Sequence, residues 1–246
     1  MRDSLDGSVA VVTGASAGIG EATAFALAEA GAAVTIAARR TDRLEALAER
    51  IEESTDGTAR VSSVDVSDAD DVANMITDTV ETFGQLDIVV NNAGIGGPGD
   101  IDACTIDAYR RLMGVNVDGM FYVTKASVPH LRETKGNLIY VASFAGCYPR
   151  PGNAVYAASK WWTRGFAHSL AGTLGPEGIG VTVINPTEVR TEIGEGDAPP
   201  MKERYAPGDV TEPQTIAAAI LFAARQDPQD TVHELDLYRR DKFEPF

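Results

Sequence analysis

Tyr156 and Lys160 form the pair of residues whose types and spacing most clearly predict chemistry. Side chains four positions apart in a helix lie on the same face. A phenol has an ordinary pKa near 10 and is a poor base at neutral pH, but a nearby positive charge stabilises the phenolate and lowers that pKa. The pair therefore predicts a tyrosine that gives a proton to a substrate oxygen or takes one from it.

Ser143 is a candidate partner of this pair, because it ends a strand-like segment that precedes Tyr156. Ligands of open α/β sheets gather outside the carboxyl ends of the strands. A serine hydroxyl at that place can hydrogen-bond the substrate oxygen and stabilise the negative charge that develops on it. A tyrosine and a lysine at this spacing also occur on ordinary surface helices, so the prediction depends on all three residues together.

A glycine-rich turn follows the first strand-like segment, reading T-G-A-S-A-G-I-G from Thr13 to Gly20. A strand, a turn and a helix N-terminus in this order make an anion site, because backbone N–H groups converge there and the helix dipole favours negative charge. Glycine lets the backbone approach a phosphate without a Cβ in the way. We therefore predict a dinucleotide pyrophosphate at Gly14, Ser16, Gly18, Ile19 and Gly20.

Two arginines follow the second strand-like segment, in the run Ala37-Ala38-Arg39-Arg40. An acidic residue at this point would bind the adenosine ribose and repel a 2′-phosphate, whereas arginine attracts the phosphate. The run predicts NADP(H) as the cofactor, with Arg39 as the principal contact and Arg40 as the second. The alternative is a pair of solvated arginines at the start of a helix.

These motifs resemble those of the short-chain dehydrogenase/reductase family, and specifically its NADP-preferring branch. The resemblance covers nearly the whole chain and implies hydride transfer between NADP(H) and a carbonyl or alcohol. In the family pattern, Asn116, Ser143, Tyr156 and Lys160 form a catalytic tetrad with Tyr156 as the general acid/base. The resemblance also implies cofactor contacts by Tyr156, by Lys160 and by residues of three further segments: Asp65 and Val66; Asn92, Ala93 and Gly94, with Asn91 nearby; and Pro186, Val189 and Thr191.

Thr187 departs from the family pattern, which places glycine after the proline. Threonine tolerates a positive φ poorly, so we expect a different turn or a different pocket depth there. By their positions, five residues are candidates to surround the substrate: Phe144, Tyr148, Asn153, Glu188 and Arg190. Either Arg190 or Arg150 could receive a carboxylate, and either could equally be a solvated loop charge.

Short β-branched segments alternate with amphipathic ones, which predicts βαβ units around a parallel sheet. The fold class we expect is α/β: a Rossmann-type doubly wound sheet of about seven strands with helices on both faces, in three α/β/α layers. The expected strands are Val9–Thr13, Ala33–Ala37, Arg60–Val64, Ile88–Val90, Asn137–Val141, Val181–Ile184 and His233–Leu237. The expected helices are Ile19–Ala30, Asp42–Glu53, Ala69–Phe83, Ile106–Glu133, Ala154–Leu174 and Pro213–Ala224.

A chain of 246 residues with 44% hydrophobic residues fits a single catalytic domain over residues 1–246. Within it, a short substrate loop is expected near 190–207, with the Gly/Pro/Glu-rich stretch Gly194–Pro200 as a mobile part. No segment approaches the roughly 20 apolar residues of a membrane span, and no secretion signal opens the sequence. We therefore expect a cytoplasmic protein.

The formal charge of −15 argues against nucleic-acid binding, which needs clustered Lys and Arg. It predicts a solvated acidic surface, and we hypothesise a high-salt source; a stability that is indifferent to molar KCl would contradict this. Cys104 and Cys147 are not spaced as a metal site, and the three histidines share no ligand spacing, so no metal is expected. We expect the substrate to be a small-molecule carbonyl or alcohol. The family commonly pairs its two long helices between subunits, so the resemblance also implies a second copy of the chain as a partner, in a dimer or tetramer.

Two alternative functions remain open at this stage. The C-terminal segment from Thr231 to Tyr238 resembles that of NADP-dependent relatives that oxidise 3-hydroxy acids such as serine and allo-threonine. The fold alone would also accommodate a cofactor-binding regulator without catalytic activity. The intact tetrad weighs against such a regulator, because a sensor has no use for those four side chains.

Overall fold

The structure, a computed structural model, describes residues 1–194 and 198–242. In that part of the chain seven strands form one parallel sheet in the order β3-β2-β1-β4-β5-β6-β7. Their bounds are β1 (Val9–Thr13), β2 (Ala33–Ala38), β3 (Thr58–Ser63), β4 (Ile88–Asn91), β5 (Asn137–Val141), β6 (Gly180–Pro186) and β7 (Glu234–Leu237). The strands match the expected ones to within two residues at each end, and β3 begins at Thr58 rather than Arg60.

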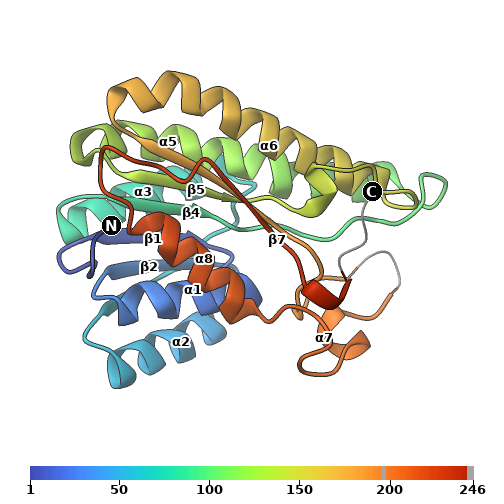
Figure 1. The fold of residues 1–246 in the computed structure, drawn as a ribbon, viewed down its shortest axis with the longest axis horizontal. Coiled ribbons are helices and arrows are strands. Elements are labelled where there is room, and N and C mark those ends of the chain that lie inside the picture. Colours follow the sequence, from blue (N-terminus) through green and yellow to red (C-terminus); the bar gives the residue numbers. More distant parts are fainter. Residues whose placement is uncertain (195–197, 243–246) are drawn as a thin grey trace.

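Helices cover both faces of the sheet and complete a three-layer α/β/α fold (Figure 1). One layer holds α1 (Gly18–Glu29), α2 (Thr41–Ser54) and α8 (Pro213–Ala224), and the other holds α3 (Ala69–Phe83), α5 (Gly119–Thr134) and α6 (Ala154–Leu174). Successive strand residues point to opposite faces, so Ala10 and Val12 of β1 pack under the first layer and Val11 packs under the second. The expected Rossmann-type fold is confirmed.

The long helix expected over Ile106–Glu133 is not α-helical throughout. Helix α4 (Ile106–Met113) leads into a π-helical turn, Gly114–Asp118, and the chain then continues as α5. Single π turns inside helices widen the backbone locally and occur often at functional sites. The turn is centred on Asn116, the tetrad asparagine of the sequence prediction.

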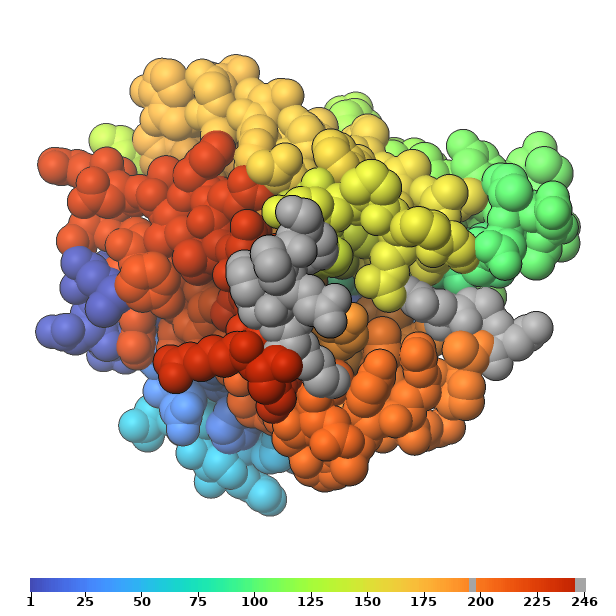
Figure 2. Space-filling view, turned by 45° about the vertical axis from the view of Figure 1, so that its right-hand side comes forward, coloured from blue at the N-terminus to red at the C-terminus, as the bar shows by residue number. Residues whose placement is uncertain are grey.

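The chain beyond β6 contains a short helix that the sequence pattern does not predict, α7 (Met201–Arg204). The loop expected at Gly194–Pro200 falls partly on residues 195–197, which lie outside the described residues. Figure 2 brings this side of the molecule forward, with the yellow segment that follows β5 above and the orange segment that contains α7 below. Every helix within the described residues is too short or too polar to cross a membrane.

Candidate active site

The sheet reverses its winding between β1 and β4, and this reversal places the glycine-rich turn beside the end of β4. Thr13 joins the two strand ends, because its Oγ1 accepts hydrogen bonds from the backbone N–H groups of Asn92 (3.1 Å) and Ala93 (3.0 Å). The Asn92 side chain donates to the Thr13 carbonyl at 2.8 Å. Crevices at such a reversal are the binding sites of open α/β sheets.

The glycine-rich turn is shaped by close backbone contacts. Gly14 and Gly18 both have positive φ, of 69° and 61°. A Cβ on Gly20 would lie 2.3 Å from the Gly14 carbonyl oxygen, so only glycine allows α1 to begin this close to β1. Ala17, which precedes α1, offers no side-chain cap to its first N–H groups. The turn therefore presents the bare helix N-terminus that a pyrophosphate requires.

A cavity of about 430 Å³ opens along this turn. Most of the expected cofactor contacts line it: Gly14, Ser16, Gly18, Ile19, Arg39, Arg40, Asp65, Val66, Asn92, Ala93, Gly94 and Thr191. Gly20 packs behind the turn. The Asn91 side chain lies away from the cavity, because it is buried and donates to the Met120 carbonyl and to Thr124. The residues that line the cavity fit a dinucleotide.

The end of this cavity next to Arg39 and Arg40, where the adenosine of the cofactor is expected and which we call the adenosine end, carries several charged side chains. Arg39 lies 3.8 Å from the Asp65 carboxylate. Asp65 accepts hydrogen bonds from the hydroxyl and the backbone N–H of Ser67, and these bonds, aided by Arg39, hold the pKa of its carboxyl below the ordinary value. Arg40 donates from Nε to the Ser16 hydroxyl at 3.1 Å, which fixes the guanidinium against the glycine-rich turn.

A second, smaller pocket adjoins the cavity and shares Ile19, Asn92 and Gly94 with it. Three of the four expected tetrad residues line this pocket: Ser143, Tyr156 and Lys160. Its wall also includes the expected contacts Phe144, Pro186, Glu188 and Val189, together with Arg150, Thr187, Ile193 and Met201. The fold thus brings together residues from the end of β5, the start of α6 and the segment after β6.

Lys160 is buried, with 5% of its surface exposed, and lies behind Tyr156. Its Nζ is 5.8 Å from the centre of the Tyr156 ring and donates to the Val141 carbonyl at 3.0 Å. Burial disfavours the charged ammonium and lowers the Lys160 pKa to about 8. Ser143 precedes a 3-10 turn, Phe144–Gly146, and its Oγ accepts from the Ala145 N–H at 3.1 Å.

Asn116 is fully buried and supports the pocket from behind. Its amide exchanges two hydrogen bonds with the backbone of Ile95, at 2.8 and 3.1 Å, and donates a third to the Ser159 hydroxyl at 3.2 Å. Ile95 lines both cavities, and Ser159 precedes Lys160 in α6. The π turn therefore aims Asn116 at the segment that joins the two cavities and at the helix that carries Tyr156 and Lys160.

Three of the expected substrate residues do not line the smaller pocket. Arg190 lies 3.8 Å from Glu212 in an ion pair. The Asn153 side chain is buried, and a Cβ on Gly97 would overlap it. Tyr148 stacks on Phe144, with ring centres 4.7 Å apart, and so supports the pocket wall from outside.

Thr187 does not have the strained backbone that its departure from the family pattern suggests. Among the described residues, Lys135 is the sole non-glycine with positive φ. The backbone N–H and the hydroxyl of Thr187 both donate to the Leu237 carbonyl at 3.2 Å. The threonine therefore joins the end of β6 to the end of β7 and also lines the pocket.

Several residues that shape the cavity were not predicted from the sequence. Arg43 and Glu192 lie at the adenosine end, where Arg43 Nη1 is 2.8 Å from a Glu192 carboxylate oxygen. The spacing of Arg43, three residues after Arg40 at the start of a helix, is a signal that could have found it. Thr13, which fastens β1 to β4, carries no such signal.

One group of possible metal ligands lies among the described residues: Cys147, Glu234 and Asp236, with ligand atoms within 4.8 Å of one another. Its two carboxylates are already engaged. Glu234 accepts from Arg164 and Asn185, and Asp236 accepts from Asn185. The expectation of a metal-free site stays a prediction.

The sequence matches the family model for short chain dehydrogenases over residues 8–201. It is 32% identical over 226 residues to a meso-2,3-butanediol dehydrogenase of Serratia marcescens, covering 90% of this chain and 89% of the relative. It is also 35% identical over 216 residues to 11-beta-hydroxysteroid dehydrogenase A of Sesamum indicum, a match that covers 87% of this chain and 62% of that longer relative.

Two solved structures have the same fold over nearly their whole length. An alcohol dehydrogenase from Thermococcus sibiricus, complexed with 5-hydroxy-NADP, superposes with a TM-score of 0.87 at 29% identity and covers 97% of this chain and 99% of that one. A 3-ketoacyl-(acyl-carrier-protein) reductase from Brucella melitensis, complexed with NADH, has a TM-score of 0.84 at 32% identity, covering 95% and 98%. The chain belongs to the short-chain dehydrogenase family and is an oxidoreductase that acts on CH–OH groups with a nicotinamide cofactor.

Proposed function

We propose that the protein is an NADP(H)-dependent oxidoreductase that interconverts a carbonyl and an alcohol, with Tyr156 as general acid/base. The observation that carries the proposal is that Ser143, Tyr156 and Lys160 line one pocket, which shares part of its wall with the larger cavity. When bound, the cofactor supplies or receives the hydride. The protein residues hold the substrate oxygen and move the proton that accompanies it.

Each pocket residue has a distinct role in this proposal. The Tyr156 hydroxyl donates a proton to the carbonyl oxygen in reduction and accepts one from the alcohol in oxidation. The buried Lys160 ammonium favours the phenolate by its charge. Ser143 hydrogen-bonds the same substrate oxygen and stabilises its negative charge. Asn116 acts through other residues, since it hydrogen-bonds the Ile95 backbone and the Ser159 hydroxyl of α6 rather than lining the pocket.

The choice of NADP(H) over NAD(H) rests on the end of β2. Ala38, Arg39 and Arg40 line the adenosine end of the cavity, and the position where a carboxylate would bind the ribose and repel a phosphate holds Ala38. The similar structures include complexes with both cofactor types. The proposal therefore depends on the charge that this chain presents to the 2′-phosphate.

A 3-hydroxy acid is the second candidate substrate class. Arg150 lines the smaller pocket together with Tyr156, whereas Arg190 does not line it. A guanidinium in a pocket wall is suited to a carboxylate. If this candidate is correct, Arg150→Gln raises KM for 3-hydroxy acids and leaves KM for simple ketones and alcohols unchanged.

The decisive assay measures NADPH oxidation and NADP⁺ reduction across a panel of ketones, aldehydes, 3-hydroxy acids, sugars and steroids, with NADH and NAD⁺ in parallel. We expect turnover with at least one compound class and a higher kcat/KM for NADPH than for NADH. A preference for NADH would contradict the cofactor proposal. NADPH binding without turnover of any compound would favour the non-catalytic regulator.

We also propose a homo-oligomer formed through α5 and α6. Apolar side chains are exposed on these helices and on α4, with 42% exposure at Phe121, 45% at Trp161 and 44% at Tyr109. Trp162 stacks on Phe166 and widens this apolar surface. Light scattering is expected to give a multiple of 26 kDa, and a 26 kDa species alone would contradict the proposal.

A further inference from the structure

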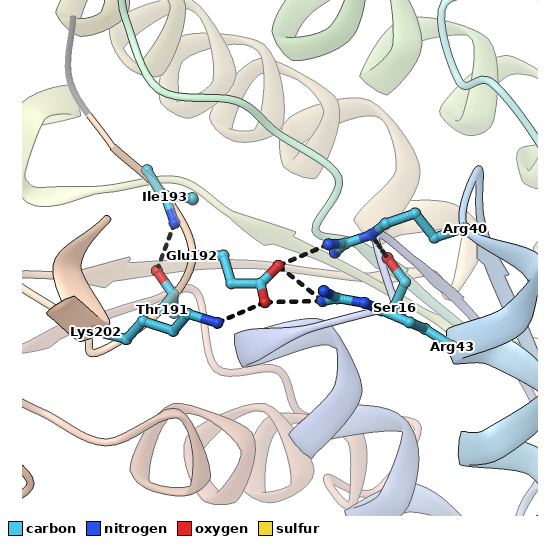
Figure 3. Close-up of polar contacts among 7 residues, drawn as sticks. All are labelled: Ser16, Arg40, Arg43, Thr191, Glu192, Ile193 and Lys202. Carbon is cyan, nitrogen blue, oxygen red and sulfur yellow. Dashed lines mark hydrogen bonds and ion pairs between the residues drawn. The ribbon is translucent and has the colours of Figure 1, made fainter. Parts of the chain in front are cut away.

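The Glu192 carboxylate lies at the adenosine end of the dinucleotide cavity, among three basic side chains (Figure 3). Its oxygens are 2.6 Å from Arg40 Nη1, 2.8 and 2.9 Å from Arg43 Nη1, and 2.8 Å from Lys202 Nζ. Hydrogen bonds from Lys202 and Arg40, with Arg43 adding to them, lower the Glu192 pKa to about 2. The carboxylate is therefore fully charged at neutral pH.

The arrangement joins segments that lie far apart in the sequence. Arg40 precedes α2 and Arg43 lies in its first turn, so their guanidinium groups meet at the same helix end. Glu192 follows Thr191, which lies after β6, and Lys202 belongs to α7. Arg40 also donates to Ser16 in the glycine-rich turn, which holds its guanidinium at the cavity wall.

We propose that Glu192 weakens the preference for NADP(H) by occupying the guanidinium groups that the 2′-phosphate needs. A carboxylate and a phosphate monoester have the same preference for paired guanidinium donors. The 2′-phosphate must therefore displace Glu192 from Arg40 and Arg43, or bind beside its negative charge. NADH carries no group that competes for these arginines.

This inference rests on the proposed NADP(H) function, and it assigns Glu192 the opposite effect from the arginines. Arg40 and Arg43 favour the phosphorylated cofactor, whereas Glu192 reduces that preference. Removing the Glu192 charge is expected to strengthen binding of ligands with a 2′-phosphate and to leave other adenosine ligands unchanged. Arg43→Gln is expected to weaken binding of ligands that carry a 2′-phosphate. It is also expected to reduce the effect of the Glu192 substitution on that binding.

The test uses two fragments of the cofactor, 2′,5′-ADP and 5′-AMP, whose Kd values are measured by isothermal titration calorimetry. Glu192→Gln keeps the side-chain size and removes the charge. Glu203→Gln is the matched control, because Glu203 is exposed on the neighbouring helix α7 and makes no ion pair among the described residues. Both variants change the net charge equally, and thermal unfolding checks that both fold.

In Glu192→Gln we expect Kd for 2′,5′-ADP to fall on the order of tenfold, and Kd for 5′-AMP to stay within about twofold. Glu203→Gln is expected to change neither value beyond about twofold. An unchanged or weaker 2′,5′-ADP affinity in Glu192→Gln, in a wild-type protein that does bind 2′,5′-ADP, would overturn this inference. If 2′,5′-ADP binds no more tightly than 5′-AMP to wild type and variant alike, the NADP(H) proposal itself fails.

Discussion

The buried ammonium of Lys160 has a cost in stability that can be measured separately from its chemistry. Burial lowers its pKa from 10.5 to about 8, and at about 1.36 kcal/mol per pKa unit this corresponds to about 3 kcal/mol. Lys160→Met removes the charge and also the hydrogen bond to the Val141 carbonyl, which contributes about 1 kcal/mol. At pH 7 we therefore expect the variant to be inactive and about 2 kcal/mol more stable than wild type, or roughly 4–8 °C higher in Tm.

The stability difference between Lys160→Met and wild type is expected to depend on pH. Because the folded-state pKa is below the unfolded one, the unfolded chain binds more protons between pH 8 and 10.5. Wild-type stability gains from this group as pH rises through that window, and the penalty is complete below pH 8. The gain in unfolding free energy of Lys160→Met over wild type should therefore shrink above pH 8 and disappear or reverse near pH 10.

Equilibrium urea unfolding at pH 7 and pH 10 measures both parts of the prediction. Lys125→Met is the control, since Lys125 is an exposed lysine of α5, and its effect should be within about 0.5 kcal/mol and independent of pH. A Lys160→Met variant that is less stable at pH 7, or whose difference from wild type does not change with pH, would refute the reasoning.

Two further predictions concern packing and pairing. Gly20→Ala places a Cβ 2.3 Å from the Gly14 carbonyl oxygen, so we expect it to weaken NADPH binding at least tenfold in fluorescence titrations. The control Gly172→Ala, where a Cβ meets nothing within 4 Å, should bind NADPH as wild type does. Wild-type NADPH affinity in both variants would contradict the packing argument. Glu234→Gln breaks the two-point ion pair with Arg164, at 2.6 and 3.0 Å, and should cost about 1–3 kcal/mol in urea unfolding at pH 7. Because pairing lowers the Glu234 pKa, the wild-type advantage should shrink as pH falls below 4.5, and a difference that stays constant down to pH 3 would be evidence against it.

The sequence was sufficient to predict the sheet and the pocket of Ser143, Tyr156 and Lys160, because local patterns specify both. Short continuous runs of apolar residues define buried strands such as Val9–Thr13, and ligands gather where parallel strands end. Ser143, Tyr156 and Lys160 each belong to such an end or to the helix that follows it, so their meeting in one pocket could be inferred.

The π turn at Gly114–Asp118 could not be predicted in the same way. One extra residue per turn hardly changes an apolar periodicity of 3.6 residues, so the pattern continues as one helix. Side-chain directions in the loops depend on distant partners. Arg190 points to Glu212, and Glu192 to Arg43, which lies 149 residues away in the chain; neither pairing leaves a local signal.

The role of Tyr156 is tested most directly by Tyr156→Phe, which removes the hydroxyl and keeps the ring. We expect kcat to fall at least about 100-fold, while Kd for NADPH, measured by fluorescence, stays within about twofold of wild type. Tyr109→Phe, at an exposed tyrosine of α4, should leave both values unchanged. A Tyr156→Phe enzyme that retains wild-type turnover would contradict the assignment of Tyr156 as the acid/base.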